Sequence, residues 1–452
     1  MTPAVLAALL GALGDAVSTD PADLESARSD KSGHVSAAAP LAFVSARSVA
    51  DVQATLRIAS EHRVPVVPRG AGTGLAGGAT AGAGEIVLST LSMNRIIEVS
   101  AADELAVVEP GVINAELGVV LATRGLWFAP DPASKAISTV GGNIATNAGG
   151  LLCAKYGVTR EAVLGLKVVL ADGRLLRLGH RSVKGVTGLD LTALMIGSEG
   201  TLGVIVEATV RLRRLVVGPV ATIGAYFANI TAAASASAAI TAAGIRPAAM
   251  ELMDAASLRA IDAHLGLDIA SRGNAYLLVQ TDGGGSAEEA AQACEIIRAL
   301  GGVAEVTADP VEGERLLAIR RAMHPSLEAI GTVLIEDVAV PRSALPEMFA
   351  AINDIETRYG ISIPTVAHAG DGNLHPNFFY DGVKVPDEVW AAADEVFLAA
   401  LRLGGTLTGE HGVGILKKRW LGRELGDDQV ELQRQLKRVF DPQGILNPGK
   451  VF

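Results

Sequence analysis

Two histidines lie seven positions apart in the segment PTVAHAGDGNLHPNFFY. The Asp371-Gly372 dipeptide between two apolar runs is a strong signal for a two-residue hairpin turn. In that register His368 lies opposite His375 on one face of the hairpin, with Cα atoms about 5.5 Å apart if the pair is hydrogen-bonded. Asn377 would share that face. Two neutral imidazoles so placed could chelate a divalent metal ion, although an ordinary cross-strand pair explains the spacing equally well.

A second segment, TGEHGVG, offers a carboxylate and an imidazole, Glu410 and His411, between glycines. Adjacent residues in an extended segment point in opposite directions, so these two side chains would have different roles. Both are candidates for the further ligand that a metal site on the hairpin would need.

A glycine-rich loop follows an expected strand in the segment VPVVPRGAGTGLAGGA. Its Gly72, Gly74 and Gly77 satisfy the G-x-G-x-x-G pattern of dinucleotide-binding folds. The next residues, GATAGAGE, cannot begin a helix, so no helix dipole would face a pyrophosphate there. The alternative is a loop whose backbone N–H groups surround a phosphate directly, with Arg69 adding positive charge.

Two further loops combine glycine with small polar residues: TVGGNIATNAGG at 139–150 and GSEGTLG at 197–203. Glycine allows the backbone to approach a ligand closely, and asparagine amides can hydrogen-bond to a ligand's edge. Three such loops indicate one large polar ligand, because a single phosphate would not need them all.

The composition of the 452 residues excludes several classes of protein. Hydrophobic residues make up 49% and charged residues 19%, which is typical of a globular chain. Lys and Arg number 38 against 49 Asp and Glu, a net charge of −11, so no nucleic-acid partner is expected and the cluster at 417–419 is a solvated helix face. Cys153 and Cys294 cannot form a disulfide scaffold or an iron–sulfur cluster, and no haem motif is present.

The apolar run Pro3–Val17 is interrupted by Gly11, Gly14 and Asp15. It is shorter than the ~18 apolar residues of a spanning helix, and no Lys or Arg precedes it. We therefore expect a helix packed on its domain, no transmembrane segment and a cytoplasmic location, with peripheral membrane association left open.

Helix-like and strand-like segments alternate between Pro40 and about Leu215 without forming a regular βαβ series. The pattern predicts helices at Val49–His62 and Ile113–Gly125, strands at Val64–Val67, Glu85–Leu88, Leu105–Val108 and Gly203–Arg211, and a hairpin of Leu164–Leu170 with Gly173–Leu178.

Composition shifts after Arg214. Helices at Thr231–Gly244 and Ala287–Leu300 and a strand at Ala275–Gln280 predict a second, smaller domain in which helices cover a sheet. A third stretch begins past Gly404 and includes a charged helix. The predicted domains are 1–215, 216–403 and 404–452.

Six motifs occur in a fixed order over Pro40–Phe452: PRGAGTGLAGG, DPASKAISTVGGNIATNAGG, KGVTGLDLTALMIGSEGTLGVI, AHAGDGNLHPN, TGEHGVG and FDPQGILNPGK. Together they resemble the flavin-dependent D-2-hydroxy-acid dehydrogenases, a family that includes cytochrome-type D-lactate dehydrogenase, the glycolate oxidase catalytic subunit and D-2-hydroxyglutarate dehydrogenase. The resemblance implies an α+β fold: a vanillyl-alcohol-oxidase-type FAD-binding domain of two α+β subdomains, an α+β substrate or cap domain, and a C-terminal helical segment that returns to the FAD domain.

The resemblance also implies which residues contact FAD. The matching positions are Pro68, Arg69, Gly70, Ala71, Gly72, Thr73, Gly74, Leu75, Pro132, Ser134, Gly141, Gly142, Asn143, Thr146, Glu199, Gly203, Ile205 and Asn447. Some members of the wider fold attach FAD covalently through a histidine in the first loop. Thr73 occupies that position here, so we expect FAD to be bound non-covalently.

In the relatives, the residues that match His368, His375 and Glu410 bind a divalent metal, Zn²⁺ or Mn²⁺, and the residue that matches His411 is the proposed base. Asn377 belongs to the same catalytic set. Such a metal stabilises a developing alkoxide as a Lewis acid, and a histidine has a useful pKa for accepting the hydroxyl proton.

Arg320 matches the family's substrate-binding arginine by its ungapped distance from Asp337, and a guanidinium suits a carboxylate. Its neighbour Arg321 is then a surface charge. Relatives that act on dicarboxylates have a lysine where this chain has Ile335 and a hydroxyl side chain where it has His324, which lacks an assigned role. A D-lactate-like monocarboxylate is therefore the expected substrate.

Three alternatives stay open at this stage: a D-2-hydroxyglutarate dehydrogenase, a glycolate oxidase catalytic subunit, and a non-catalytic flavin-binding subunit. An oxidase that uses oxygen is a further variant of the enzymatic interpretation. Electrons would pass to an external acceptor, a quinone, a cytochrome or an electron-transfer flavoprotein, which no residue identifies. A homodimer is compatible with the sequence but not indicated by it.

Overall fold

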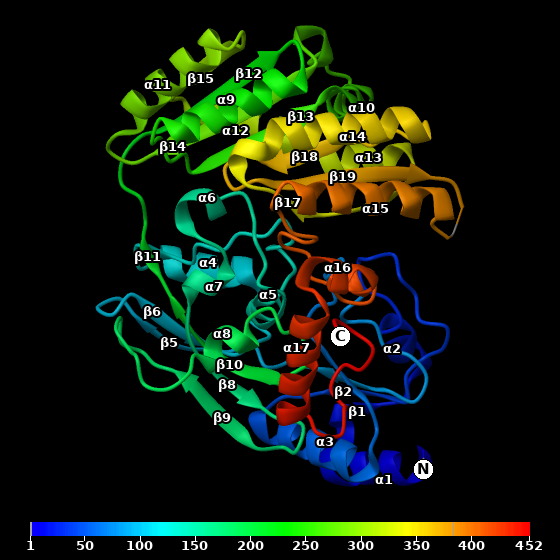
Figure 1. Ribbon diagram of the computed structural model, residues 1–452. Coiled ribbons are helices and arrows are strands. Elements are labelled where there is room, and N and C mark those ends of the chain that lie inside the picture. The colour runs from blue at the N-terminus through cyan, green and yellow to red at the C-terminus, as the bar shows by residue number, and fades with distance from the viewer. Residues whose placement is uncertain (1, 383) are drawn as a thin grey trace. The chain divides into compact units, whose positions relative to one another are not determined.

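The computed structural model describes residues 2–382 and 384–452 (Figure 1). Its contacts divide the chain into two compact units. The first consists of the residues up to Gly150, Gly157–Leu215 and Glu410–Phe452, and the second of Leu151–Tyr156 and Val216–Gly409. The domain limits predicted from the sequence lie at 215/216 and 403/404. The contacts place residues 404–409, and also residues 151–156, with the second unit.

The first sheet of the first unit has four strands in the order β1-β2-β4-β3. The strands are β1 (Val17–Ser18), β2 (Ala42–Ser45), β3 (Val66–Arg69) and β4 (Ile86–Ser89). β2 and β3 both pair with β4 in parallel. Helices α1 (Thr2–Leu13) and α3 (Val49–His62) bury Val5, Leu9 and Leu56 in the core beside this sheet. The predicted packed helix in the apolar run is confirmed up to Leu13, where a 3₁₀ turn and β1 take over.

Helix α3 has the limits that its sequence predicts. Ser48 caps it by accepting a hydrogen bond from the Asp51 N–H at 3.2 Å. Arg63 ends it in the left-handed conformation, with φ of 53°. The Ser48 cap is a signal that the sequence carries locally, whereas the left-handed conformation of Arg63 is seen only in the structure.

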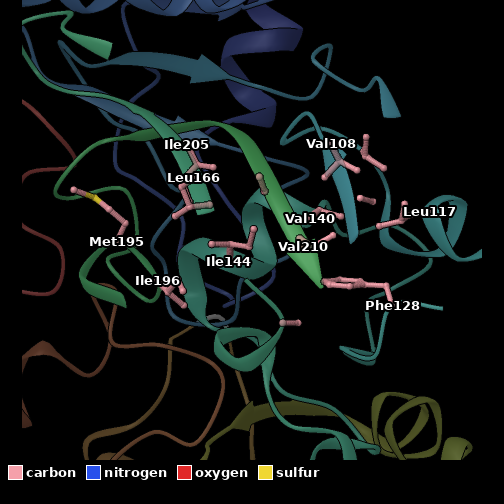
Figure 2. Close-up of a cluster of buried hydrophobic side chains, with 14 of the residues drawn as sticks. Val108, Leu117, Phe128, Val140, Ile144, Leu166, Met195, Ile196, Ile205 and Val210 are labelled. Carbon is pink, nitrogen blue, oxygen red and sulfur yellow. The ribbon is translucent and has the colours of Figure 1, made fainter. Parts of the chain in front are cut away.

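The second sheet of the first unit has five antiparallel strands in the order β5-β6-β10-β8-β9. They are β5 (Ile96–Ser100), β6 (Leu105–Val108), β8 (Val163–Val169), β9 (Leu175–Gly179) and β10 (Val204–Arg211). Leu166 and Val210 of this sheet form one core with Leu117 of α4 (Asn114–Ala122) and Ile144 of α5 (Val140–Thr146), as Figure 2 shows. This core fixes the position of α5, which carries the second glycine-rich loop.

Further helices and one short strand pair complete the first unit. They are α2 (Pro21–Ser26), α7 (Thr159–Ala162), α8 (Leu191–Met195), α16 (Leu421–Leu425), α17 (Asp427–Phe440), the strand pair β7 (Leu126–Trp127) and β11 (Arg213–Arg214), and two 3₁₀ turns at Gly14–Ala16 and Lys418–Trp420. The segment after α17 returns to the edge strand β3. Val66 N–H donates to Ile445 O at 2.8 Å, and Asn447 N–H donates to Val66 O at 2.8 Å.

The second unit is built on an antiparallel sheet in the order β15-β12-β14-β13-β18-β19-β16, with β17 paired to β19. The strands are β12 (Val220–Phe227), β13 (Ala249–Asp254), β14 (Ala275–Asp282), β15 (Val303–Thr307), β16 (Thr332–Ile335), β17 (Val338–Ala339), β18 (Thr365–His368) and β19 (Asn373–Tyr380). β13 is the middle strand of the seven in this order.

Helices cover both faces of this sheet (Figure 1). They are α9 (Ile230–Ala242), α10 (Ala255–Leu265), α11 (Ser286–Ala299), α12 (Pro310–Arg321), α13 (Met323–Ile330), α14 (Leu345–Tyr359) and α15 (Asp387–Arg402), with the short α6 (Cys153–Tyr156) and 3₁₀ turns at Ala270–Arg272 and Arg342–Ala344. On β14, Tyr276 and Leu278 pack in one core with α10, α12 and α13. Leu277 and Val279, which point to the opposite face, are also fully buried.

The fold positions two sets of candidate residues in separate units. The glycine-rich loops belong to the first unit, and the histidine hairpin and Arg320 belong to the second. Among the described residues, no helix is long and apolar enough to cross a membrane.

Candidate functional site

The histidine hairpin forms from β18 and β19, but its register differs from the predicted one. His368 lies opposite Asn373, and His375 lies opposite Val366. The turn is therefore Ala369–Gly372 and not the Asp371-Gly372 dipeptide alone. A two-residue turn of the predicted kind needs positive φ at both central residues, and in this turn only Gly372 has it, at 89°.

Neighbouring strands explain the wider turn. Gly370 N–H donates to Met250 O at 3.2 Å, and Val340 N–H donates to Gly372 O at 2.9 Å. The sum of paired residue numbers changes from 743 to 741, and an even change leaves every side chain on its face. His368 and His375 consequently still share one face, with ring centroids 5.1 Å apart in an edge-to-face arrangement.

His368 is oriented by a buried carboxylate on the adjacent strand. Glu251 lies directly opposite His368 in the β13–β18 pairing. His368 Nδ1 lies 2.8 Å from Glu251 Oε1 and 3.0 Å from Oε2. Because an ionised carboxylate only accepts hydrogen bonds, Nδ1 carries the proton and Nε2 is the basic nitrogen of this ring. That is the tautomer a metal-binding histidine needs.

The environment of His375 contains a second buried carboxylate. Asp337 Oδ1 lies 4.0 Å from His375 Nδ1. Asp337 also accepts hydrogen bonds from Asn373 Nδ2 and from Thr408 Oγ1, each at 2.6 Å. The bond from Thr408 fixes the end of the second unit. Glu410 follows two residues later and is joined directly to Gly409, the last residue of that unit.

Asn377 uses its amide nitrogen within the hairpin. Nδ2 donates to Pro364 O at 3.0 Å and to His375 O at 2.7 Å. Its partner across the β16–β19 pairing is Ile335. The predicted catalytic residue Asn377 therefore holds the backbone that carries His375.

Arg320 lies at the end of α12 with its side chain 14% exposed, and its Nε donates to Glu251 Oε2 at 2.8 Å. Within the described part of the chain, no residue accepts a hydrogen bond from its two terminal nitrogens. The guanidinium can therefore bind a carboxylate in a two-pronged manner through these nitrogens. Arg321 is 57% exposed and pairs with Glu314, which agrees with a surface charge.

His324, whose role the sequence left open, lies on the surface of α13. Its side chain is 53% exposed, and Nε2 lies 3.2 Å from Glu328 Oε1 one helical turn away. An exposed pair of this kind contributes little to stability. His324 is therefore a surface residue paired within its own helix.

In the first unit, the three glycine-rich loops lie together. A Cβ on Gly70 would meet Thr139 Oγ1 at 2.6 Å, and one on Gly200 would meet Pro68 Cγ at 3.0 Å. Asn447 links two of these loops by donating from Nδ2 to Gly78 O at 3.0 Å and to Glu199 O at 2.7 Å. Segments that are far apart in sequence thus converge as one large ligand would require.

Several buried polar atoms at these loops fit a polar ligand. Asn143 Nδ2, Ser138 Oγ and Asn447 Oδ1 have no hydrogen-bond partner among the described residues. Most buried polar groups in folded proteins are satisfied, so these three atoms identify places where a bound group would complete the hydrogen bonding. The loops and their unsatisfied atoms fit FAD.

Arg69 is used differently from the expected phosphate-binding charge. Its Nη1 donates to Ser29 O at 3.0 Å and to Ala79 O at 2.7 Å, and its Nη2 donates to Ser26 O at 3.2 Å. The guanidinium therefore fastens the first glycine loop to the preceding chain. The side chain of Ile205 also has a structural role, because it packs in the hydrophobic core of the five-stranded sheet.

Glu199 connects the third glycine loop to the segment after His411. Its carboxylate accepts from Val413 N–H at 2.7 Å and from Gly414 N–H at 2.9 Å. Burial raises the pKa of Glu199 to about 7, although these two hydrogen bonds and the charge of Lys417 act in the opposite direction.

Glu251, Ser138 and Thr139 were not among the residues singled out from the sequence. Glu251 had a detectable signal, an acidic residue inside the otherwise apolar strand AMELMD. A charge at such a position requires buried partners. Ser138 and Thr139 differ in no visible way from other small polar residues of the loops.

Comparisons with known proteins match two consecutive parts of the chain to two domain models. Residues 40–179 match the model of an FAD binding domain, and residues 219–451 match that of the C-terminal domain of FAD linked oxidases. Over nearly its whole length the fold is similar to that of p-cresol methylhydroxylase, with a TM-score of 0.79 at 18% identity, covering 99% of this chain and 96% of that one. The 4-ethylphenol oxidase of Gulosibacter chungangensis has a TM-score of 0.78, also at 18% identity and with the same coverage. The predicted vanillyl-alcohol-oxidase-type α+β fold is thereby confirmed.

The chain belongs to the family of FAD-linked oxidases and is an oxidoreductase that uses FAD. It is 43% identical over 423 residues to the glycolate oxidase subunit GlcD of Bacillus subtilis, covering 91% of this chain and 89% of the relative. It is 37% identical over 403 residues to a D-lactate dehydrogenase of Archaeoglobus fulgidus, covering 89% of each. The family resemblance drawn from the six motifs is confirmed.

We predict that Gly141→Ala lowers the FAD content of the purified protein. A Cβ at this position would lie 2.9 Å from both Cα and O of Pro110, so the start of α5 would have to move. Flavin bound per chain is measured by absorbance, together with the thermal stabilisation given by added FAD.

Gly118→Ala is the matched control for this prediction. Gly118 lies inside α4 with nothing within 4 Å of its Cβ position, and alanine favours a helix by up to about 1 kcal/mol. Equal FAD content in the two variants would show that the close approach of Gly141 to Pro110 does not matter.

A second prediction concerns pH. Since the pKa of Glu199 is about 7 in the folded chain and 4.5 in its ordinary state, its contribution to stability is complete below pH 4.5 and is lost as pH rises through 7. In FAD-free protein, the free energy of unfolding of the wild type should fall over this range by roughly 3 kcal/mol relative to Glu199→Gln. Chemical unfolding at several pH values measures the difference, and a difference that stays constant with pH would contradict it.

Proposed function

We propose that the enzyme oxidises a D-2-hydroxy acid with one carboxylate, of the D-lactate kind, to the corresponding 2-oxo acid. One observation carries the proposal. His368, whose ring lies edge-to-face against that of His375, and Arg320, whose two terminal nitrogens have no acceptor among the described residues, both contact the same carboxylate, Glu251. A 2-hydroxy acid offers a hydroxyl oxygen for a metal and a carboxylate for a guanidinium on adjacent carbons.

In this proposal His368, His375 and Glu410 bind Zn²⁺ or Mn²⁺, and the three glycine loops bind FAD without a covalent bond. The donor set of two imidazoles and a carboxylate suits either ion. When bound, FAD supplies a two-electron acceptor for the α-hydrogen and the metal supplies a Lewis acid at the hydroxyl oxygen.

The protein's own side chains divide the remaining work. Arg320 binds the substrate carboxylate through its terminal nitrogens and so orients the α-carbon. An imidazole nitrogen of His411 accepts the hydroxyl proton as the carbonyl forms. Asn377 holds the backbone of the hairpin through Pro364 O and His375 O, which makes it a positioning residue in this proposal.

The preference for a monocarboxylate is supported by Ile335, which lies opposite Asn377 on β16. An isoleucine cannot pair with the distal carboxylate of a substrate such as D-2-hydroxyglutarate. The names of the relatives from B. subtilis and A. fulgidus refer to glycolate and D-lactate, both of which have a single carboxylate. Electrons then pass to an external acceptor, a quinone, a cytochrome or an electron-transfer flavoprotein.

Anaerobic bleaching of the flavin tests this proposal. D-lactate and a bulkier D-2-hydroxy monocarboxylate should bleach the flavin, L-lactate and D-2-hydroxyglutarate should do so far more slowly, and a chelator should abolish the reaction until Zn²⁺ or Mn²⁺ is returned. Acid precipitation should leave the flavin in the supernatant.

Each opposite result has its own meaning. Faster bleaching by D-2-hydroxyglutarate would favour the dicarboxylate dehydrogenase, and glycolate as the best substrate would favour a glycolate oxidase. An FAD-containing protein that no 2-hydroxy acid bleaches would be a non-catalytic flavin-binding subunit. Bleaching that a chelator leaves unchanged would remove the metal from the proposal.

We further predict that Arg320→Lys raises the KM for D-lactate by about 10- to 100-fold, because an ammonium ion cannot replace a two-pronged guanidinium. Arg321→Lys is the matched control on the same helix and should leave the KM unchanged. Steady-state kinetics with an artificial electron acceptor measures both variants. Equal effects of the two substitutions would show that Arg320 does not bind the substrate.

A further inference from the structure

Glu251 is the only carboxylate in the described residues that contacts both His368 and Arg320. It lies on β13, the middle strand of the sheet, and is 1% exposed. Its Oε2 accepts from Arg320 Nε at 2.8 Å and lies 3.0 Å from His368 Nδ1, while Oε1 lies 2.8 Å from the same nitrogen.

We propose that Glu251 is a positioning residue that holds the metal ligand His368 and the carboxylate-binding Arg320 at the same time. This inference rests on the proposed function and extends it to a residue that touches neither substrate nor metal. One side chain then controls both the affinity for the metal and the placement of the substrate carboxylate.

The two contacts select particular atoms. The bond to Nδ1 keeps the proton on that nitrogen of His368, so that Nε2 is the nitrogen that binds a metal. The bond to Arg320 uses Nε, the nitrogen nearest the side-chain stem, so neither terminal nitrogen is used by Glu251. A contact to either terminal nitrogen would leave only one of them for a substrate.

Charge also favours this arrangement. A divalent cation bound to His368 would repel the guanidinium of Arg320. Both residues contact Glu251 Oε2, with Arg320 Nε at 2.8 Å and His368 Nδ1 at 3.0 Å. A buried negative charge in contact with both residues would lower that repulsion. A neutral residue of the same size could not do so.

An ordinary buried ion pair is the simpler interpretation of Glu251 and Arg320. Such a pair would explain the contact with Nε, but it would not require a second contact with the histidine of another strand. The two interpretations differ in what a glutamine at this position does. Its amide oxygen accepts from one partner, and its NH₂ group then faces the N–H of the other.

The test uses the FAD-containing protein and its Glu251→Gln and Glu251→Asp variants. Zn²⁺ affinity is measured without substrate, by competition with a coloured chelator, and steady-state kinetics with D-lactate are then measured at saturating Zn²⁺. Glu251→Gln should weaken Zn²⁺ binding about 10- to 100-fold. It should also raise the KM for D-lactate more than it lowers kcat, and Glu251→Asp should recover part of both losses.

Glu305→Gln is the matched control in the same sheet. Glu305 pairs with Arg272 at 3.2 Å on the surface of β15, so its loss removes an arginine–glutamate pair away from the hairpin. This variant should keep the wild-type Zn²⁺ affinity and KM. Flavin content and thermal unfolding confirm that each variant is folded, and Glu251→Asp serves if Glu251→Gln does not fold.

The outcomes separate this inference from the proposed function. If D-lactate bleaches the wild-type flavin but Glu251→Gln changes only one of the two quantities, or neither, the positioning role is overturned and the function stands. If Zn²⁺ binding depends on Glu251 but D-lactate does not react, the substrate assignment fails while the control of His368 by Glu251 is supported. A wild type that binds no Zn²⁺ overturns both the metal site and the inference.

Discussion

A negative charge in the middle of a buried sheet is the constraint on which the second unit depends. Glu251 occupies the central strand of that sheet, where burying an unpaired carboxylate would cost several kcal/mol. Its partners come from different elements, His368 from β18 and Arg320 from the end of α12. The need to satisfy this one side chain therefore ties a helix to the histidine hairpin, and it brings the groups that define the proposed chemistry to the same place.

In the first unit, the glycine-rich loops are held together by close backbone approach and by hydrogen bonds to main-chain groups. Its three glycine loops lie in contact because side chains are absent at the points of approach, as at Gly70 beside Thr139. The residues that hold these loops use their polar groups on main-chain atoms: Arg69 on three carbonyl groups, Asn447 on two, and Glu199 on two N–H groups. The loops are thus fixed by the protein itself, while Ser138 Oγ and Asn143 Nδ2 have no hydrogen-bond partner among the described residues.

The sequence predicted local features better than long-range ones. The predicted limits of α3 are confirmed, with Ser48 capping its own helix, and the strand at Leu105–Val108 was predicted to the residue. The hairpin register was wrong because Met250 and Val340, distant in sequence, pair with the turn and widen it. The shared face of the two histidines survived this error, since side-chain direction depends only on whether a residue number is odd or even.

The same distinction applies to the candidate residues. Arg320 and Arg321 are adjacent and chemically identical in the sequence, and only the position of Glu251 separates a buried guanidinium from a surface one. The six motifs identified the family correctly, because each one covers most or all of the residues of a loop. They could not show that Arg69 donates its hydrogen bonds to backbone carbonyl groups, because its partners Ser26 and Ser29 lie outside the motif.

The return of the chain to β3 has a consequence for synthesis on the ribosome. Val66 is made early, but the groups that bond to it, Ile445 O and Asn447 N–H, are made some 380 residues later. In the meantime the second unit, whose residues lie between these points, can be completed first. Until then the edge of β3 that does not face β4 lacks its partner at Val66, and an unpaired strand edge is open to pairing with other chains. The first unit therefore begins to be synthesised first but receives the last of its bonds to β3 only at the end of synthesis.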